Sequence, residues 1–322
     1  MITKIPVEKE KTKWLEQRAN TIGGSEAGTI LGMNPFQSAY GLWAEKTGKT
    51  APFTGNLATD VGTYLEPFVA KKFEEETGLK VQRSNFIWFN SDYPKQHASP
   101  DRMIPSQRAG LEIKTTSAWN NAKFKDGQFP IQYYAQCVQY MCVTGYPIWY
   151  LAVLVGNQGF HIYMLRDNED IPVPSWVEGS LVVDQDDRKA LKEACESFLD
   201  CVEKDIPPAV DGSDDCTDTL QEIFTAEEGT SMRLYCNPTI EKLLDVKKKI
   251  EELKEVQQDI ENQLKAEMGN TETAYCGKWR ISWKEQNRSQ VDTKRLRADL
   301  PEVALRYTKT YTVRTFSVKE DK

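Results

Sequence analysis

The chain has 322 residues, of which 39% are hydrophobic and 28% are charged, and this composition is typical of a soluble globular protein rather than a disordered one. The longest apolar run, IWYLAVLV at 148–155, is too short to span a bilayer, and the N-terminal residues contain no apolar secretion signal, so we expect a cytoplasmic protein. The net charge of −7 argues weakly against a nucleic-acid partner, although an acidic chain can still carry a basic groove.

The expected elements alternate between helices and strands. In chain order they are a broken helix at 12–32, a helix within 34–49, a helix at 56–77, strands at 79–90 and on either side of the turn PSQRAG (105–110), a helix at 130–145, strands at 148–155 and 159–165, and a helix at 185–202. The first helix breaks at Gly23 and Gly24, and Ser25 is expected to cap the helix that follows. This order predicts an α/β fold with one mixed central sheet.

The composition changes after residue 205. The segment DIPPAVDGSDD (205–215) predicts a linker over 206–235 that separates a first domain at 1–205 from a C-terminal region at 236–322. In that region, 240–268 reads as a coiled-coil-like helix whose seam residues alternate by four and three: Val246, Ile250, Leu253, Gln257, Ile260 and Leu264. A basic, aromatic segment follows and predicts a small hairpin beside a helix.

Cysteine and histidine usage argues against two kinds of metal site. The seven cysteines form no C-x-x-C pair, and their odd number in a chain without an export signal indicates reduced thiols. His97 and His161 are the only histidines, which is too few for a His-rich zinc site.

Two carboxylates and a lysine are expected to meet on one face of the sheet. Strand side chains alternate, so Glu112 and Lys114 of GLEIKTTS (110–117) share a face, and Asp101 lies at the start of the preceding strand. Asp101, Glu112 and the backbone carbonyl of Ile113 could supply hard oxygen ligands to Mg²⁺, which usually takes one or two protein carboxylates plus phosphate oxygens. Lys114 would orient or help deprotonate the attacking water and offset charge on the phosphate. The alternative interpretation is an exposed strand with an ordinary Glu–Lys pair.

Several motifs together resemble the PD-(D/E)XK nuclease superfamily and, more narrowly, the YqaJ-type viral recombinases, relatives of bacteriophage lambda exonuclease. The resemblance covers most of residues 12–205, and its motifs are the pair Arg18 and Ser25, GTYLE ending in Glu66, SPD ending in Asp101, EIK at 112–114, and QCVQY from Gln136 to Tyr140. It implies a restriction-endonuclease-like core, a mixed central sheet flanked by helices, with a C-terminal helical, coiled-coil-like appendage.

The resemblance also implies roles for these residues. Glu66 would reach a second metal ion, directly or through water, so that two Mg²⁺ ions bind and Mn²⁺ can substitute. Gln136 would form a hydrogen bond near the scissile phosphate or the attacking water, with Tyr140 beside it as support. Arg18 and Ser25 would receive a terminal 5′-phosphate.

The function implied by the resemblance is a Mg²⁺-dependent exonuclease that degrades linear double-stranded DNA from the 5′ end. The product would be a 3′ single-stranded tail for recombination by strand annealing, with a single-strand annealing protein as partner. A homo-oligomer is implied, with a trimeric ring favoured, from a phage or prophage gene expressed in a bacterial cytoplasm. Two alternatives stay open: a structure-specific or restriction-like endonuclease on the same core, and a non-catalytic DNA-binding or assembly protein on a nuclease-like core.

Overall fold

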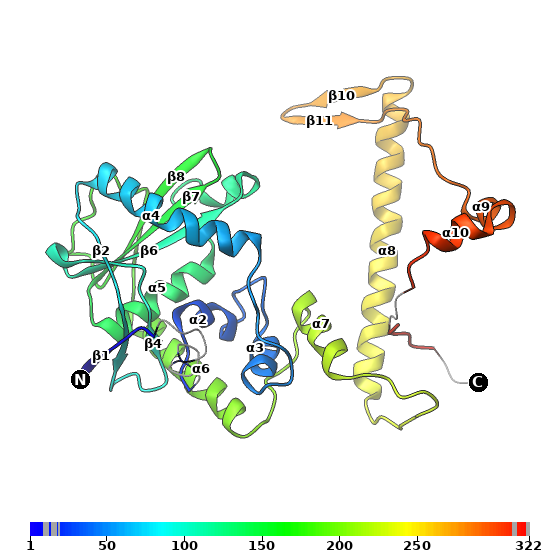
Figure 1. The fold of residues 1–322 in the computed structure, drawn as a ribbon. Helices are drawn as coiled ribbons and strands as arrows, with labels where there is room; N and C mark the ends of the chain where they lie inside the picture. Colours follow the sequence, from blue (N-terminus) through cyan, green and yellow to red (C-terminus); the bar gives the residue numbers. More distant parts are fainter. Residues whose placement is uncertain (9–12, 14–17, 19, 311–313, 320–322) are drawn as a thin grey trace. The chain divides into compact units, whose positions relative to one another are not determined.

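A computed structural model describes residues 1–8, 13, 18, 20–310 and 314–319, and it divides into two compact units, Met1–Thr225 and Ala226–Lys322 (Figure 1). We call them the N-terminal and the C-terminal unit and describe each by itself. The boundary between them lies within 206–235, the segment predicted as a linker.

In the described part of the N-terminal unit, a six-stranded mixed sheet forms the centre. Its order is β2-β5-β6-β7-β8-β9, with β6 parallel to β7 and β8 parallel to β9, and the other neighbours antiparallel. The strands are β2 (Gln82–Arg83), β5 (Arg102–Ile104), β6 (Ala109–Thr116), β7 (Ile148–Val155), β8 (Gly159–Arg166) and β9 (Gly179–Val182). A smaller sheet consists of β1 (Ile2–Pro6), β3 (Phe86–Asn90) and β4 (His97–Ala98).

Helices cover both faces of the central sheet. Figure 1 shows α4 running across one side of the sheet and α5 lying on the other side, near α2 and α6. The helices are α2 (Gly24–Ile30), α3 (Ala39–Lys46), α4 (Leu57–Thr77), α5 (Ile131–Thr144), α6 (Gln185–Glu203) and α7 (Asp214–Ile223), and the short 3₁₀ helices are η1 (Pro105–Gln107) and η2 (Ala118–Phe124). This is the fold class that the sequence predicts, a mixed sheet flanked by helices.

Each face of the sheet carries its own apolar cluster. On the side of α4, Val69 and Phe73 pack with Leu111 of β6, whereas Trp149 of β7 belongs to the cluster on the side of α5. Gly110 is required here, because a Cβ at that position would lie 2.3 Å from the Trp149 ring. The central strands are therefore buried on both sides, which fixes their register.

Several expected elements differ in detail. The strand expected at 79–90 is divided between β2 and β3, which belong to different sheets, and β1, β9 and α7 were not predicted. The part of the first helix that would contain Trp14 and Leu15 lies outside the described residues.

The cap expected at Ser25 is wrong. The N-cap of α2 is Gly23, whose extended backbone (φ −84°, ψ 162°) ends the preceding segment and whose N–H donates to Glu26 Oε2 at 2.7 Å. Ser25 lies inside the first turn with an exposed side chain. Glu26, at the third position of the helix, bonds the N–H of the cap residue, which is one half of a capping box.

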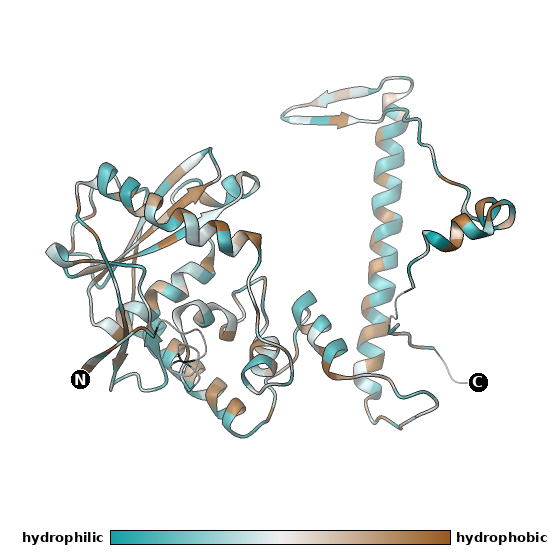
Figure 2. Ribbon diagram, viewed as in Figure 1, coloured by the Kyte–Doolittle hydropathy of each residue, from teal (hydrophilic) through white to brown (hydrophobic). Residues whose placement is uncertain are grey.

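The C-terminal unit contains the long helix expected at 240–268. It is α8 (Asn237–Met268), followed by the hairpin β10 (Thr273–Cys276) and β11 (Trp279–Ser282) and by the short helices α9 (Thr293–Asp299) and α10 (Pro301–Arg306). Figure 2 shows hydrophobic residues spaced among hydrophilic ones along α8. Within the described residues, no helix is both long enough and apolar enough to cross a bilayer.

Candidate active site

Asp101 and Glu112 lie together where β5 ends beside β6. The last paired residues are Arg102 and Leu111, and one position further the Asp101 Oδ2 accepts a hydrogen bond from the backbone N–H of Ile113 at 2.8 Å. The Asp101 carboxylate thus accepts the backbone hydrogen bond that β5 no longer provides to Ile113 of β6. Because side chains alternate, Arg102 and Leu111 face α4, while Asp101 and Glu112 face the opposite side of the sheet.

Glu112 is the centre of the polar cluster on that side. Its side chain is 3% exposed, and its Oε1 accepts from Lys114 Nζ at 2.6 Å and from Gln136 Nε2 at 2.7 Å. Among the described groups, its buried Oε2 has no hydrogen-bond partner. An unsatisfied buried carboxylate oxygen is costly, so this atom is a position where a cation would stabilise the protein.

Burial and charge shift the pKa values of Asp101 and Lys114. Burial and the neighbouring Glu112 carboxylate raise the pKa of Asp101 well above its ordinary value. Burial would lower the pKa of Lys114, but the carboxylates of Glu112 and Asp101 outweigh it and the pKa is raised. The metal-free cluster therefore favours the protonated form of Lys114, which donates a hydrogen bond to Glu112.

Helix α5 supplies the next layer of the site. Gln136 and Tyr140 share a helix face, and the Gln136 amide donates both to Glu112 and to Tyr140 Oη, the latter at 3.0 Å. Both side chains are buried. The start of α2 packs directly on this pair, because a Cβ on Gly24 would lie 2.3 Å from the Tyr140 ring. A chain of contacts therefore runs from α2 through α5 to the carboxylates.

Glu66 of α4 approaches from the other face of the sheet. It forms an ion pair with Arg102, which also donates to the backbone carbonyl of Asp101 at 2.8 Å. Arg102 was missed by sequence reasoning; it directly follows SPD, but spacing alone could not show which carboxylate it meets. Since Arg102 stands between Glu66 and the cluster, the role of Glu66 as a metal ligand stays a prediction.

The cluster offers oxygen atoms for one hard cation, which Asp101, Glu112 and the carbonyl of Ile113 would hold. Among the described residues, no three His, Cys, Asp or Glu side chains lie close enough together to hold a metal ion. Two carboxylates, one of them with an unpartnered buried oxygen, still fit Mg²⁺, which takes its remaining ligands from water and phosphate. The Ile113 carbonyl points to the same side as its N–H, past the end of β5.

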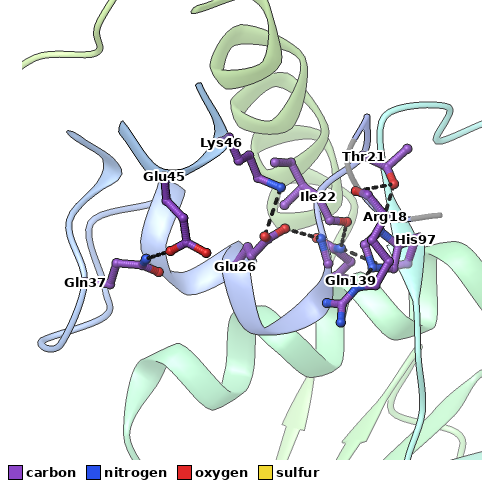
Figure 3. Close-up of polar contacts among 10 residues, drawn as sticks. Arg18, Thr21, Ile22, Glu26, Gln37, Glu45, Lys46, His97 and Gln139 are labelled. Carbon is purple, nitrogen blue, oxygen red and sulfur yellow. Dashed lines mark hydrogen bonds and ion pairs between the residues drawn. The ribbon is translucent and has the colours of Figure 1, made fainter. Parts of the chain in front are cut away.

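Arg18 is anchored beside the start of α2 (Figure 3). Its Nε–H donates to His97 Nε2 at 2.7 Å, so the other ring nitrogen carries the proton and donates to Thr21 Oγ1 at 2.8 Å. Burial and the Arg18 charge hold the pKa of His97 well below its ordinary value. A Cβ on Gly23 would lie 2.6 Å from Arg18 Nη2, so the guanidinium lies against the first turn of α2, which contains Ser25. Nothing in the sequence pattern signalled the contact with His97.

The sequence of this chain matches known proteins over the whole site. The family model of the YqaJ-like viral recombinase domain matches residues 13–147, which include every candidate site residue from Arg18 to Tyr140. The uncharacterized protein YqaJ of Bacillus subtilis (strain 168) is 32% identical, over 97% of this chain and 95% of that protein.

Among solved structures, the chain is similar to the alkaline exonuclease LHK-Exo of Laribacter hongkongensis, with 20% identity, 61% of this chain and 94% of that chain covered, and a TM-score of 0.48. It is also similar to a putative exonuclease from Eubacterium rectale, with 12% identity, 70% and 97% of the two chains covered, and a TM-score of 0.45. A phage related exonuclease from Haemophilus somnus 129PT has 12% identity, covers 58% of this chain and 96% of its own, and has a TM-score of 0.40.

Proposed function

The chain belongs to the YqaJ-like viral recombinase family, and from that premise we propose that it is a divalent-metal-dependent exonuclease that degrades one strand of linear double-stranded DNA. The observation that carries the proposal is the cluster of Asp101, Glu112 and Lys114 on one sheet face, with the buried Glu112 Oε2 left without a partner among the described groups. A cluster built for stability alone would not leave a buried carboxylate oxygen unsatisfied.

Asp101, Glu112 and the Ile113 carbonyl would hold Mg²⁺, with Glu66 serving a second ion. When bound, the metal supplies an activated water and neutralises charge on the phosphate during in-line hydrolysis, and Mn²⁺ is expected to substitute for it. In the metal-free cluster the carboxylates of Glu112 and Asp101 raise the pKa of Lys114, and its ammonium group would donate to a phosphate oxygen as negative charge develops there. We therefore favour charge stabilisation over proton abstraction as its role.

Gln136 would position the attacking water. Its amide nitrogen already donates to Glu112 and to Tyr140, so its carbonyl oxygen is the atom that can accept a hydrogen bond from water. Tyr140 holds this amide in place and is a positioning residue, because it contacts Gln136 rather than the reacting atoms.

Digestion is proposed to begin at the 5′ end. A terminal phosphate carries an extra negative charge that an internal phosphodiester lacks, and Arg18 with the Ser25 hydroxyl would recognise it. The Nε–H of Arg18 is bonded to His97, which would hold the guanidinium charge at this position. The packing of Gly24 on Tyr140 supports this placement, since it joins the Arg18 side to the carboxylate side.

Membership in a viral recombinase family supports a proposal for the biological setting. A recombinase that leaves 3′ single-stranded tails needs an annealing protein as its partner, and we propose that this chain works with one in the cytoplasm of a bacterial host. We further propose a homo-oligomer, a trimeric ring, that would keep the enzyme on its substrate.

The experiment is hydrolysis of a linear duplex that carries a 5′-phosphate, with either strand end labelled, in Mg²⁺ and in EDTA. We expect metal-dependent release from the 5′ end and no cutting of closed circular DNA, and Asp101→Asn should abolish it while the exposed control Asp218→Asn should not. Nicking of closed circles would replace the exonuclease with an endonuclease, and absence of any metal-dependent hydrolysis would overturn the proposal.

A further inference from the structure

A hairpin in the C-terminal unit presents bare aromatic rings among basic side chains. Tyr275, Trp279 and Trp283 are 74%, 67% and 49% exposed, although aromatic rings of this size are usually covered in a folded protein. The hairpin β10–β11 follows α8 directly in the chain (Figure 1).

The strand register places these rings on both faces of the ribbon. Tyr275 pairs directly with Arg280, so the two side chains are neighbours on one face. Trp279 and Trp283 lie on the other face, because the ladder continues past β11 through a hydrogen bond from Trp283 N to Glu272 O at 2.9 Å. Trp279 and Trp283 are four positions apart, so their Cα atoms are separated by roughly 13 Å along an extended strand. That spacing accommodates a few nucleotides of an extended strand.

The same stretch is basic in an acidic protein. Residues 273–288 contain a single acidic residue, Glu285, against the four exposed cations Lys278, Arg280, Lys284 and Arg288. This local charge of +3 contrasts with −7 for the chain. Lys278 Nζ lies 5.1 Å from the centre of the Trp279 ring, so cations and rings share one surface.

We propose that the β10–β11 hairpin binds single-stranded DNA. Proteins that bind single strands without sequence preference combine cations that contact the phosphates with aromatic side chains on which bases stack, and the hairpin has both. An acidic protein partner would use the cations but would leave the three exposed rings without a role. The single strand is therefore the occupant that uses the whole surface.

This inference rests on the proposed function for its biological meaning. If the N-terminal unit trims one strand of a duplex, the hairpin would hold the single strand that the reaction leaves. Binding itself can be measured without hydrolysis, so the two proposals fail separately.

The test is fluorescence anisotropy of a labelled oligo(dT) of about twenty nucleotides with the full-length protein in EDTA, which prevents hydrolysis. From the usual effect of removing one stacked base, Trp279→Ala with Trp283→Ala should weaken binding at least about tenfold, and Phe at both positions should restore most of it. The matched control is Trp119→Ala, which removes a tryptophan that is 94% exposed in the N-terminal unit and should leave the affinity unchanged.

Charge is tested separately. Lys278→Gln with Arg280→Gln should reduce the dependence of log K on log salt by roughly 0.7 for each lost phosphate contact, whereas Lys248→Gln on α8 should leave it unchanged. The tryptophan variants should keep the wild-type salt dependence.

Three results would overturn the inference. The first is equal affinity for oligo(dT) in the wild type and in the double tryptophan variant. The second is the same loss with Trp119→Ala. The third is displacement of the oligonucleotide by poly-L-glutamate at equal charge, which would assign the hairpin to an acidic protein surface. Hydrolysis of short duplexes by the double tryptophan variant should match the wild type, and a wild type that binds but never hydrolyses would contradict only the proposed function.

Discussion

Replacing Lys114 with methionine should lower the free energy of unfolding, because it leaves the buried Glu112 carboxylate without its cation. The ion pair has an Nζ–Oε1 distance of 2.6 Å, and the side chains of Lys114 and Glu112 are 22% and 3% exposed. Methionine keeps most of the side-chain volume and removes the charge. Glu112 would then retain one donor, Gln136.

The expected loss follows from this burial. Removing one partner of a fully buried ion pair typically costs about 3–5 kcal/mol, and because Lys114 is partly exposed we expect about 2–4 kcal/mol of unfolding free energy. For a unit the size of Met1–Thr225, that corresponds to a fall in Tm of roughly 4–16 °C. The control is Lys71→Met on α4, whose side chain is 76% exposed and lies 3.8 Å from Glu75, and which should cost less than about 0.5 kcal/mol.

The assay is urea denaturation in EDTA, followed by a double-mutant cycle with Glu112→Gln. In the double variant the lone buried charge is gone, so most of the stability lost in Lys114→Met should return, while hydrolysis should be absent in all three variants. A cost below about 0.5 kcal/mol for Lys114→Met, or a double variant as unstable as the single one, would refute the assignment of Glu112 as a buried charge held by Lys114.

Three further predictions test other parts of the site. Burial raises the pKa of Asp101, so the metal-free protein should lose stability as the pH rises from the ordinary carboxyl range through that raised value. Asp101→Asn should remove this loss, and an Asp101→Asn variant whose stability in EDTA depends on pH as in the wild type would contradict the prediction. Gly24→Ala would place a Cβ 2.3 Å from the Tyr140 ring and should cost about 1–3 kcal/mol in thermal denaturation, whereas Ser25→Ala in the same turn should cost almost none. Arg18→Ala should erase the preference for 5′-phosphorylated over 5′-hydroxyl ends in initial-rate measurements, and a preference that persists would remove Arg18 from the end-binding site.

Period-two alternation was sufficient to predict one part of the site. It placed Glu112 and Lys114 on one sheet face, and the structure brings them together with Asp101. Helical spacing likewise placed Gln136 and Tyr140 on one face of α5, where both contact the cluster or each other. These are local relations within one strand or one helix, so a single sequence contains them.

Contacts between distant segments could not be predicted in the same way. The ion pair of Glu66 with Arg102 and the hydrogen bond of Arg18 with His97 join residues that lie 36 and 79 positions apart. Both depend on how helices dock on strands, which side-chain periodicity does not encode. The cap of α2 was missed because glycine and serine are both common cap residues, and only the extended backbone of Gly23 shows where the helix begins.

The most direct test of the proposed metal-dependent hydrolysis uses a duplex that carries one phosphorothioate at its first 5′ linkage. Sulfur is a soft ligand that Mg²⁺ binds poorly and Mn²⁺ tolerates better. If Asp101 and Glu112 hold an ion against the scissile phosphate, the sulfur-substituted linkage should be cut slowly in Mg²⁺ and at a largely restored rate in Mn²⁺. Equal rates for the two linkages in Mg²⁺, or a slow rate that Mn²⁺ does not restore, would contradict a metal ion at the reacting phosphate.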